Sequence, residues 1–311
     1  MSESKFLNRY SPHQKVINYN AGGQQDRLLL GIVLMVVGES LLVAMGAVIK
    51  HISSDGVSLL QIVFLRNFLA LVFLFPLVYR VGLYQLKTQH LKIHVLRGLF
   101  GLSAMFCMFY SFSNIMLSEA VLLKATSPVM LALMAWLVLR EKLSALTWCA
   151  IVMAFIGVII IVEAGNVREG FQLGYVAGVA SALLAALAKV MVRKLGRTEA
   201  SEVIVFYFAI FGAIVTMPLA IMFWQNTSFV NWGFFLLIAA LASFGQLFIT
   251  KAFTVAKAGV VSVFTYLSMP IAGVLGWVVW EESFNMSLLL GTIIVIGAGV
   301  MIFYVHQCAS K

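Results

Sequence analysis

The sequence predicts an all-α membrane protein with ten transmembrane helices in two inverted five-helix repeats. Three observations lead to this fold class: an apolar composition, ten apolar runs of spanning length, and matching features in the two halves 142 residues apart. Of the 311 residues, 62% are hydrophobic and 11% are charged, and the mean hydropathy is +1.02. Because soluble domains carry about 25% charged residues, lipid must be the solvent for most of this chain.

Ten apolar runs are long enough to cross the hydrocarbon layer, which takes about 20 residues of helix. Charges and turn residues separate them. The runs are 28–49, 57–79, 95–113, 117–139, 146–164, 171–192, 201–224, 232–254, 258–280 and 286–305. Residues 1–27 are polar and lack the apolar stretch of a signal peptide, so we expect a mobile cytoplasmic tail there.

Positive charge is concentrated in alternate loops. With the N-terminus inside, the cytoplasmic segments hold fifteen lysines and arginines, including Arg97 at the start of the third span, whereas the opposite loops hold only Lys50 and Arg168. Because positively charged loops stay in the cytoplasm, this bias predicts that both termini lie on the cytoplasmic side of an inner membrane. It also explains the net charge of +9 without nucleic-acid binding.

An internal repeat relates the two halves of the chain. A shift of 142 residues superposes the Ile-Val-Phe run at 62–64 on that at 204–206, and it superposes two pairs of prolines. Each copy (28–164 and 171–305) holds five spans, so the two copies must lie in opposite orientations, as in many transporters that work by alternating access. The prolines, each expected to break or hinge its helix, are Pro76, Pro128, Pro218 and Pro270.

Polar residues at bilayer depth are costly and usually face a cavity or a partner. Glu39 is interpreted either as a coupling or substrate-anchoring carboxylate or as the ion-pair partner of Arg66 or Lys124. Arg66 itself can clamp a carboxylate or phosphate, or tie two helices together. Lys124 and Tyr266 each precede a proline by four residues, where the freed carbonyl exposes polar backbone. The candidate substrate-binding or coupling residues are Glu39, Arg66, Tyr110, Lys124, Lys189, Tyr207, Gln246 and Tyr266.

The distribution of charge and of small residues indicates which helices surround the cavity. Basic residues outnumber acids within the spans, which favours an anionic or zwitterionic solute. Span 171–192 carries a stripe of glycine and alanine for close packing, and a neighbouring stripe that ends at Lys189. Spans 146–164 and 286–305 carry no charge away from their ends, so we expect outer helices or the contact of a homodimer.

Other classes of function find less support. A membrane enzyme needs convergent His, Asp or Cys groups, but the five histidines lie in loops or tails, and His90 and His94 read as a surface pair without a carboxylate. No Walker loop for ATP occurs, and the three cysteines lack metal-ligand spacing, so neither a cofactor nor a metal is predicted. A channel or a scaffold stays open, as does the coupling partner, a proton or a counter-substrate.

Several motifs resemble the EamA family of the drug/metabolite transporter superfamily. They are Phe64-Leu65-Arg66 in the second span, Ser127-Pro128 in the fourth and the charged run 140–144 before the fifth, with Glu281 as the counterpart of Glu141 in the second half. The resemblance covers about residues 28–305. It implies a cavity lined by spans one to four and six to nine, and substrates among amino acids, nucleotide-like metabolites, organic anions or drugs.

Overall fold

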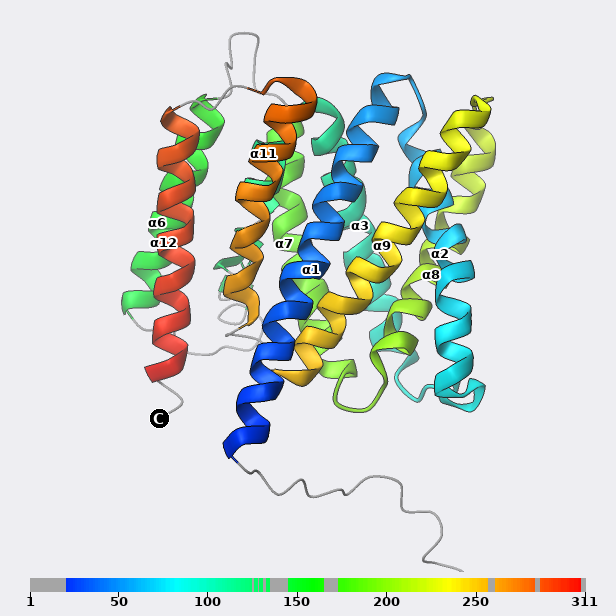
Figure 1. Cartoon of the computed structure of the whole chain (residues 1–311), viewed down its shortest axis with the longest axis horizontal. Helices are drawn as coiled ribbons and strands as arrows, with labels where there is room; N and C mark the ends of the chain where they lie inside the picture. Colours follow the sequence, from blue (N-terminus) through cyan, green and yellow to red (C-terminus); the bar gives the residue numbers. More distant parts are fainter. Residues whose placement is uncertain are drawn as a thin grey trace, which may run out of the picture.

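The computed structural model is all-helical over the residues that it describes (Figure 1). These are residues 21–124, 126–127, 129–130, 133–134, 145–164, 173–256, 261–282 and 286–308. Within these ranges no strand occurs, and six helices are long and apolar enough to cross a membrane. The predicted all-α membrane class is confirmed at this level, whereas the count of ten spans stays a prediction.

The six long helices each correspond to a predicted span. They are α1 (Ala21–Ser54), α2 (Leu59–Val81), α3 (Leu91–Asn114), α7 (Leu173–Leu195), α8 (Ser201–Met222) and α9 (Phe229–Val255). Helical elements also occupy described parts of the other four predicted spans. They are α4 (Leu117–Lys124), α6 (Ala145–Ala164), the 3-10 helix η2 (Ser262–Leu267) with α11 (Ser268–Trp280), and α12 (Met286–Cys308). A short 3-10 helix, η1 (Leu83–Leu86), joins α2 to α3.

The helices pack in pairs that join the two halves of the sequence. Helix α1 lies along α9, α3 along α7, α2 along α8, and α6 along α12 (Figure 1). In every one of these pairs, one helix comes from residues 28–164 and the other from residues 171–305. The two halves therefore interlock helix by helix and share one interior.

Small residues allow the closest of these contacts. A Cβ atom added to Gly38 of α1 would lie 3.0 Å from the carbonyl oxygen of Gly245 in α9, and a Cβ on Gly245 would lie 3.1 Å from the carbonyl oxygen of Gly38. On α7, a Cβ on Gly178 would lie 2.6 Å from Leu123 Cδ1. Since apolar burial against lipid drives little association, such backbone approach supplies much of the packing.

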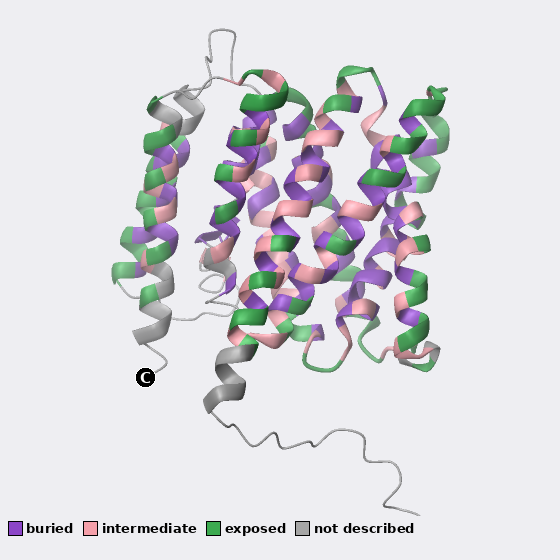
Figure 2. Ribbon diagram, viewed as in Figure 1, coloured by how far each residue is buried: buried purple, intermediate pink, exposed green. Residues whose placement is uncertain are grey.

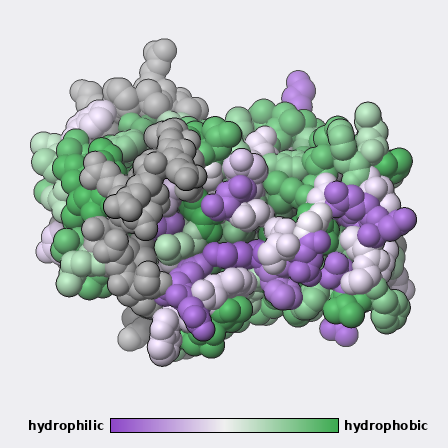
Figure 3. Space-filling view, turned by 90° about the horizontal axis from the view of Figure 1, so that it is seen from above, coloured by the Kyte–Doolittle hydropathy of each residue, from purple (hydrophilic) through white to green (hydrophobic). Residues whose placement is uncertain are grey.

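The outside of the bundle is apolar. Large side chains such as Phe68, Phe75, Ile221 and Trp277 stay exposed on it, whereas the buried residues line the inside of the bundle (Figure 2). Seen end on, hydrophilic residues form a band across the face, and hydrophobic residues occupy much of the rest of it (Figure 3). A surface of this kind is unfavourable in water and suited to lipid tails, as in a multi-pass membrane protein.

Two of the six long helices start four or more residues before the predicted boundary. Helix α1 begins at Ala21, inside the predicted tail, of which residues 1–20 lie outside the described residues. Helix α3 begins at Leu91, four residues before the predicted span, so that Arg97 lies in its second turn and not in a loop. In both places helical hydrogen bonding extends beyond the apolar stretch that delimited the span.

The predicted helix breaks have different outcomes. Helices α2 and α8 continue past Pro76 and Pro218, which lie exposed near the helix ends. Pro270 lies in the first turn of α11, directly after η2, so the ninth predicted span changes helix type two residues before its proline. Pro128 lies outside the described residues.

A polar cavity as the candidate functional site

A half-open cavity lies between seven helices, and its empty space amounts to about 960 Å³, a volume that includes open solvent at its mouth. Its described lining residues belong to α1, α2, α3, α4, α7, α8 and α9, and none belongs to α6 or α12. Apolar side chains form most of the wall, with Met45, Met105, Phe109, Phe112, Phe208, Ile249 and Phe253 among them. Five ionisable side chains line the same space: Glu39, Arg66, Arg97, Lys124 and Lys189.

Glu39 and Lys124 form an ion pair in this cavity. Lys124 Nζ lies 2.9 Å from Glu39 Oε2, and it joins the end of α4 to the middle of α1. The Glu39 side chain is 2% exposed and that of Lys124 is 21% exposed. The carboxylate is thus fully removed from solvent, and the lysine keeps access to the cavity.

Lys189 lies on the stripe of α7 that was predicted from small residues. Ser181 and Ala185 precede it on the same helix face, and all three line the cavity. Its ammonium donates to Ser127 Oγ at 3.1 Å and lies 6.0 Å from the centre of the Phe253 ring. Because Ser181 and Ala185 are small, they leave space beside the helix for the ammonium group of Lys189.

Arg66 is held in place by its neighbour Asn67. Arg66 Nη1 donates to Asn67 Oδ1 at 2.7 Å, and Asn67 Nδ2 donates to the carbonyl oxygen of Val63 at 2.8 Å. Gly212 of α8 lies directly against this amide, since a Cβ there would be 2.5 Å from Asn67 Cγ. Arg66, which is 3% exposed, is therefore fixed on α2, and its buried Nε has no hydrogen-bond partner and stays available to another group.

Arg97 is a cavity residue that the sequence reasoning placed in a loop. It is 5% exposed, its guanidinium carbon lies 3.8 Å from the centre of the Phe208 ring, and its Nη2 donates to Gln246 Oε1 at 3.4 Å. Gly101, one turn further along α3, gives the space that the guanidinium occupies. The spacing of Arg97, Gly98 and Gly101 is the sequence signal that could have indicated a packed helix start here, but it was not used in the prediction.

Five of the eight predicted residues line the cavity, and the three tyrosines do not. Tyr110 is 37% exposed on α3. The Tyr207 hydroxyl donates to the carbonyl oxygen of Leu86. Tyr266 is 4% exposed, and its hydroxyl occupies the space beside Gly299 of α12. Besides Arg97, the cavity contains Ser181, Phe208 and Thr250, which were not among the predicted site residues.

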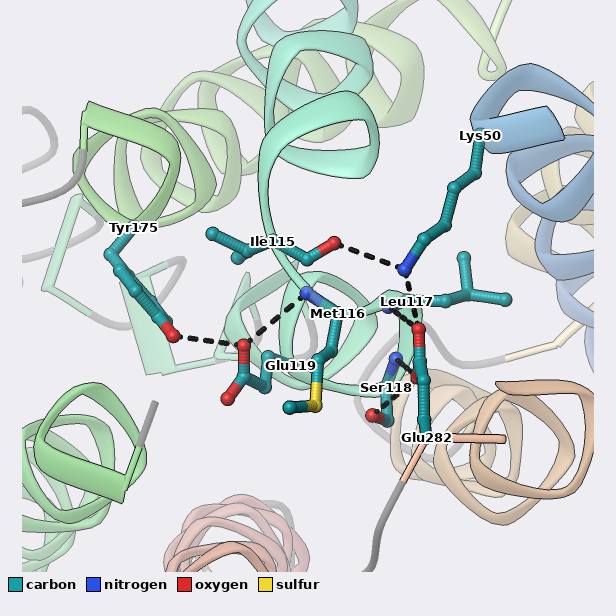
Figure 4. A network of polar contacts seen from close by, with 8 residues as sticks. All are labelled: Lys50, Ile115, Met116, Leu117, Ser118, Glu119, Tyr175 and Glu282. Atoms are coloured by element: carbon teal, nitrogen blue, oxygen red, sulfur yellow. Dashed lines mark hydrogen bonds and ion pairs between the residues drawn. The ribbon is translucent and has the colours of Figure 1, made fainter. Parts of the chain in front are cut away.

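Beyond α3, a second polar cluster surrounds Glu282 (Figure 4). Glu282 Oε1 lies 2.5 Å from Lys50 Nζ and accepts the backbone N–H of Leu117 at 2.8 Å, while Oε2 accepts the Ser118 hydroxyl at 3.1 Å. Glu282 thus caps the start of α4 and ties it to the end of α1. The counterpart that the sequence suggested, Glu281, is exposed and ends α11 in a left-handed conformation (φ 55°), which turns the next residue inward.

A third polar cluster lies at the other end of α3. His94 Nε2 lies 2.6 Å from Glu199 Oε2, Thr88 Oγ1 donates to Glu199 Oε1, and the ring of Tyr207 stacks on that of His94 at 4.3 Å. His94 is 4% exposed, so the predicted surface pair with His90 was wrong for this residue, because Glu199 from the α7–α8 connection covers it.

A charged cavity inside a bundle with an apolar outside is the arrangement of membrane transporters. The sequence profile of the EamA-like transporter family matches this chain twice, over residues 29–163 and again over residues 172–304. The chain belongs to this family, as its motifs predicted.

Named relatives span a range of transported compounds. The chain is similar to the pseudopaline exporter CntI of Pseudomonas aeruginosa, at 27% identity over 88% of this chain and 95% of the relative. It is also similar to the S-adenosylmethionine uptake transporter of Rickettsia prowazekii, at 25% identity over 78% of this chain and 82% of the relative. A solved crystal structure with 17% identity superposes over 92% of this chain and 99% of its own with a TM-score of 0.62, which shows a shared fold.

Proposed function

We propose that this protein is a secondary-active transporter that carries a small anionic or zwitterionic metabolite across the inner membrane by alternating access. The observation that carries the proposal is the charge of the cavity. Among its described lining residues, four are basic, and Glu39 is the one acid that faces them. Buried positive charge is costly, so a solute that supplies negative charge is stabilised there.

The relatives support a transport function, but they determine neither the direction of transport nor the substrate. The substrate class is therefore argued from the cavity of this chain. One relative is an exporter and another is an uptake transporter, and their compounds differ. The proposal of an anionic or zwitterionic solute therefore rests on the five ionisable side chains and not on a relative's name.

Alternating access is supported by the relation between the two halves. The family profile matches twice, and the starts of the two matches are 143 residues apart (172 − 29). If one half is exchanged for the other, the pair α1–α9 becomes α7–α3, while α2–α8 and α6–α12 become themselves. A two-fold axis between inverted repeats gives this pattern, and two such halves can exchange conformations to open opposite ends.

The clusters at the two ends of α3 fit such an exchange. Lys50 and Glu282 join α1, α4 and the segment after α11 at one end, and His94 and Glu199 join α3 to the α7–α8 connection at the other. An alternating-access cycle requires each end to open in turn, so one of these ion pairs must separate while the other holds. Glu39 is the proposed coupling carboxylate, with a proton or a counter-substrate as the coupling partner.

The proposal includes the orientation of the chain in the membrane and the helices that lie away from the cavity. Both termini lie in the cytoplasm, by the loop charges. Helices α6 and α12, which pair with each other and contribute no described residue to the cavity, are available for a homodimer contact.

Counterflow in proteoliposomes tests the proposal. Vesicles loaded with an unlabelled organic anion should take up the labelled anion transiently above equilibrium, and the rate should saturate with concentration. A channel gives no counterflow, and a scaffold or an enzyme gives no flux. Uptake confined to lipophilic cations would point to a drug exporter of the same fold.

A further inference from the structure

Resting on the transporter proposed above, we infer that the substrate carries two separate anionic groups, one bound by Arg66 and Arg97 against the ring of Phe208 and the other bound by Lys189. Such a compound is a dicarboxylate or another dianion with an apolar spacer. Three features of the cavity lead to this substrate class.

The first feature is a pair of arginines with free donors. Both guanidinium carbons lie close to the centre of the Phe208 ring, at 3.8 Å for Arg97 and 5.5 Å for Arg66. Arg66 Nε, Arg97 Nε and Arg97 Nη1 are buried without a hydrogen-bond partner. Guanidinium groups bind carboxylates through two parallel hydrogen bonds, so one carboxylate matches these free donors.

The second feature is that each described carboxylate near the cavity already has a partner elsewhere. Glu39 is bound to Lys124, Glu119 accepts from the Tyr175 hydroxyl, Glu199 is bound to His94, and Glu282 is bound to Lys50. Within the described part of the chain, no carboxylate therefore lies with Arg66 and Arg97. A buried pair of like charges lacks its counter-ion, and the substrate is the species that supplies it.

The third feature is a separate positive charge at Lys189. Its hydrogen-bond acceptor is the neutral hydroxyl of Ser127, while the carboxylate of Glu39 is engaged by Lys124. Lys189 comes from α7 and Arg66 from α2, on different walls of the same cavity. A substrate with one carboxylate on the arginines leaves Lys189 with no negative charge nearby except Glu39, which Lys124 already binds, whereas a second carboxylate pairs with Lys189 directly.

The apolar part of the cavity wall suits the middle of such a molecule. Met105, Met108 and Phe109 of α3 line the cavity and offer no polar side-chain group beyond thioethers. A short hydrocarbon chain packs against them, and a strongly hydrated spacer does not.

The experiment compares acids of equal carbon number on the purified full chain. Thermal-shift titrations use succinate, glutarate and adipate against butyrate, valerate and hexanoate, with sodium chloride at matched ionic strength. Glycerol phosphate tests a single doubly charged group. We expect one dicarboxylate to reach half of the maximal thermal shift at about tenfold lower concentration than the monocarboxylate of the same carbon number. A tenfold difference is what one additional charge-assisted hydrogen bond contributes. Equal responses, or glycerol phosphate matching the best dicarboxylate, would overturn the two-group substrate.

Variants assign the two ends of the substrate. Lys189→Gln should remove the advantage of the dicarboxylate and keep the response to the monocarboxylate, and Lys189→Arg should restore it. Arg97→Gln should weaken both responses. Lys251→Gln, at an exposed position of α9, is the matched control and should change neither. An unchanged dicarboxylate advantage in Lys189→Gln contradicts the inference.

Flux separates this inference from the proposed function. Saturable counterflow of monocarboxylates without preference for dicarboxylates refutes the two-group substrate and leaves the transporter standing. Binding of dicarboxylates without counterflow refutes the transporter.

Discussion

Arg66 and Phe208 occupy equivalent positions in the two halves of the chain and face each other in the cavity. They are 142 residues apart (208 − 66), the shift that superposes the repeats, and the Arg66 guanidinium carbon lies 5.5 Å from the centre of the Phe208 ring. The same shift matches Glu39 with Ser181, which also lines the cavity. The two halves thus place different side chains at equivalent positions. The helices pair symmetrically, but the lining of the cavity is asymmetric.

This relationship makes Phe208 a test of the arginine pair. Phe208→Leu keeps an apolar side chain but removes the ring face from both guanidinium groups. Because a desolvated cation–π contact contributes about 1–2 kcal/mol, we expect the half-saturating concentration of an anionic substrate to rise about fivefold or more. Substrate titration in proteoliposomes measures it. The control is Phe206→Leu on the same helix, in an apolar cluster outside the cavity. Equal effects of the two changes would show that the ring acts only in packing.

Glu39→Gln should separate coupling from binding. The change removes the carboxylate from Lys124, 2.9 Å away, and leaves an amide that neither takes up nor releases a proton at the pH of transport. If Glu39 is the coupling group, uptake driven by a pH gradient is lost, while counterflow between equal pH values continues. Asp55→Asn, in an exposed turn, is the control. Gradient-driven uptake at the wild-type rate in Glu39→Gln removes this role from Glu39.

From the sequence, the charged residues that line the cavity could be predicted better than the positions of the tyrosines. Glu39, Arg66, Lys124 and Lys189 stood out because a charge within an apolar run has few favourable places in lipid. Tyrosine is tolerated both at a membrane interface and in a core, so its position in a span says little about which way it points. Tyr266 illustrates this, since the absence of a side chain at Gly299 decides where its hydroxyl goes.

The features that the sequence left hidden depend on neighbours far away in the chain. Arg97 looked like a loop charge because the apolar run begins just before it, and Phe208 and Gln246 from the second half are what enclose it. His94 is buried by Glu199, which is 105 residues further along. Glu281 and Glu282 are adjacent in the sequence, and their residue type does not tell them apart. The left-handed backbone at Glu281 makes Glu282 the one that reaches α4.

Glu282→Gln should loosen one end of the bundle. The amide can still accept a hydrogen bond from the start of α4, but it loses the ion pair with Lys50 and the favourable charge at a helix N-terminus. We expect a lower melting temperature, and faster labelling of a cysteine placed at Ser118. Glu281→Gln is the matched control, because Glu281 is adjacent in the sequence and exposed. Equal labelling rates in the two variants would mean that Glu282 does not hold this end closed.

The crossing of α1 and α9 gives a prediction about stability. In Gly38→Ala the new Cβ would lie 2.8 Å from Ile249 Cγ1 and 3.0 Å from the carbonyl oxygen of Gly245, so the two helices must move apart. Overpacking of this kind costs about 1–3 kcal/mol, which lowers the melting temperature of the purified protein. Gly233→Ala on α9 is the control, because no atom lies within 4 Å of its Cβ, and alanine gains up to about 1 kcal/mol in helix propensity.

The double variant Gly38→Ala/Gly245→Ala distinguishes one shared contact from two separate ones. Each new Cβ approaches the carbonyl oxygen of the other glycine, so a single separation of α1 from α9 relieves both contacts. The loss of stability in the double variant should therefore be smaller than the sum of the single losses, as for residues in contact. Additive losses, or a melting temperature of Gly38→Ala equal to that of Gly233→Ala, would show that the helices do not meet at these glycines.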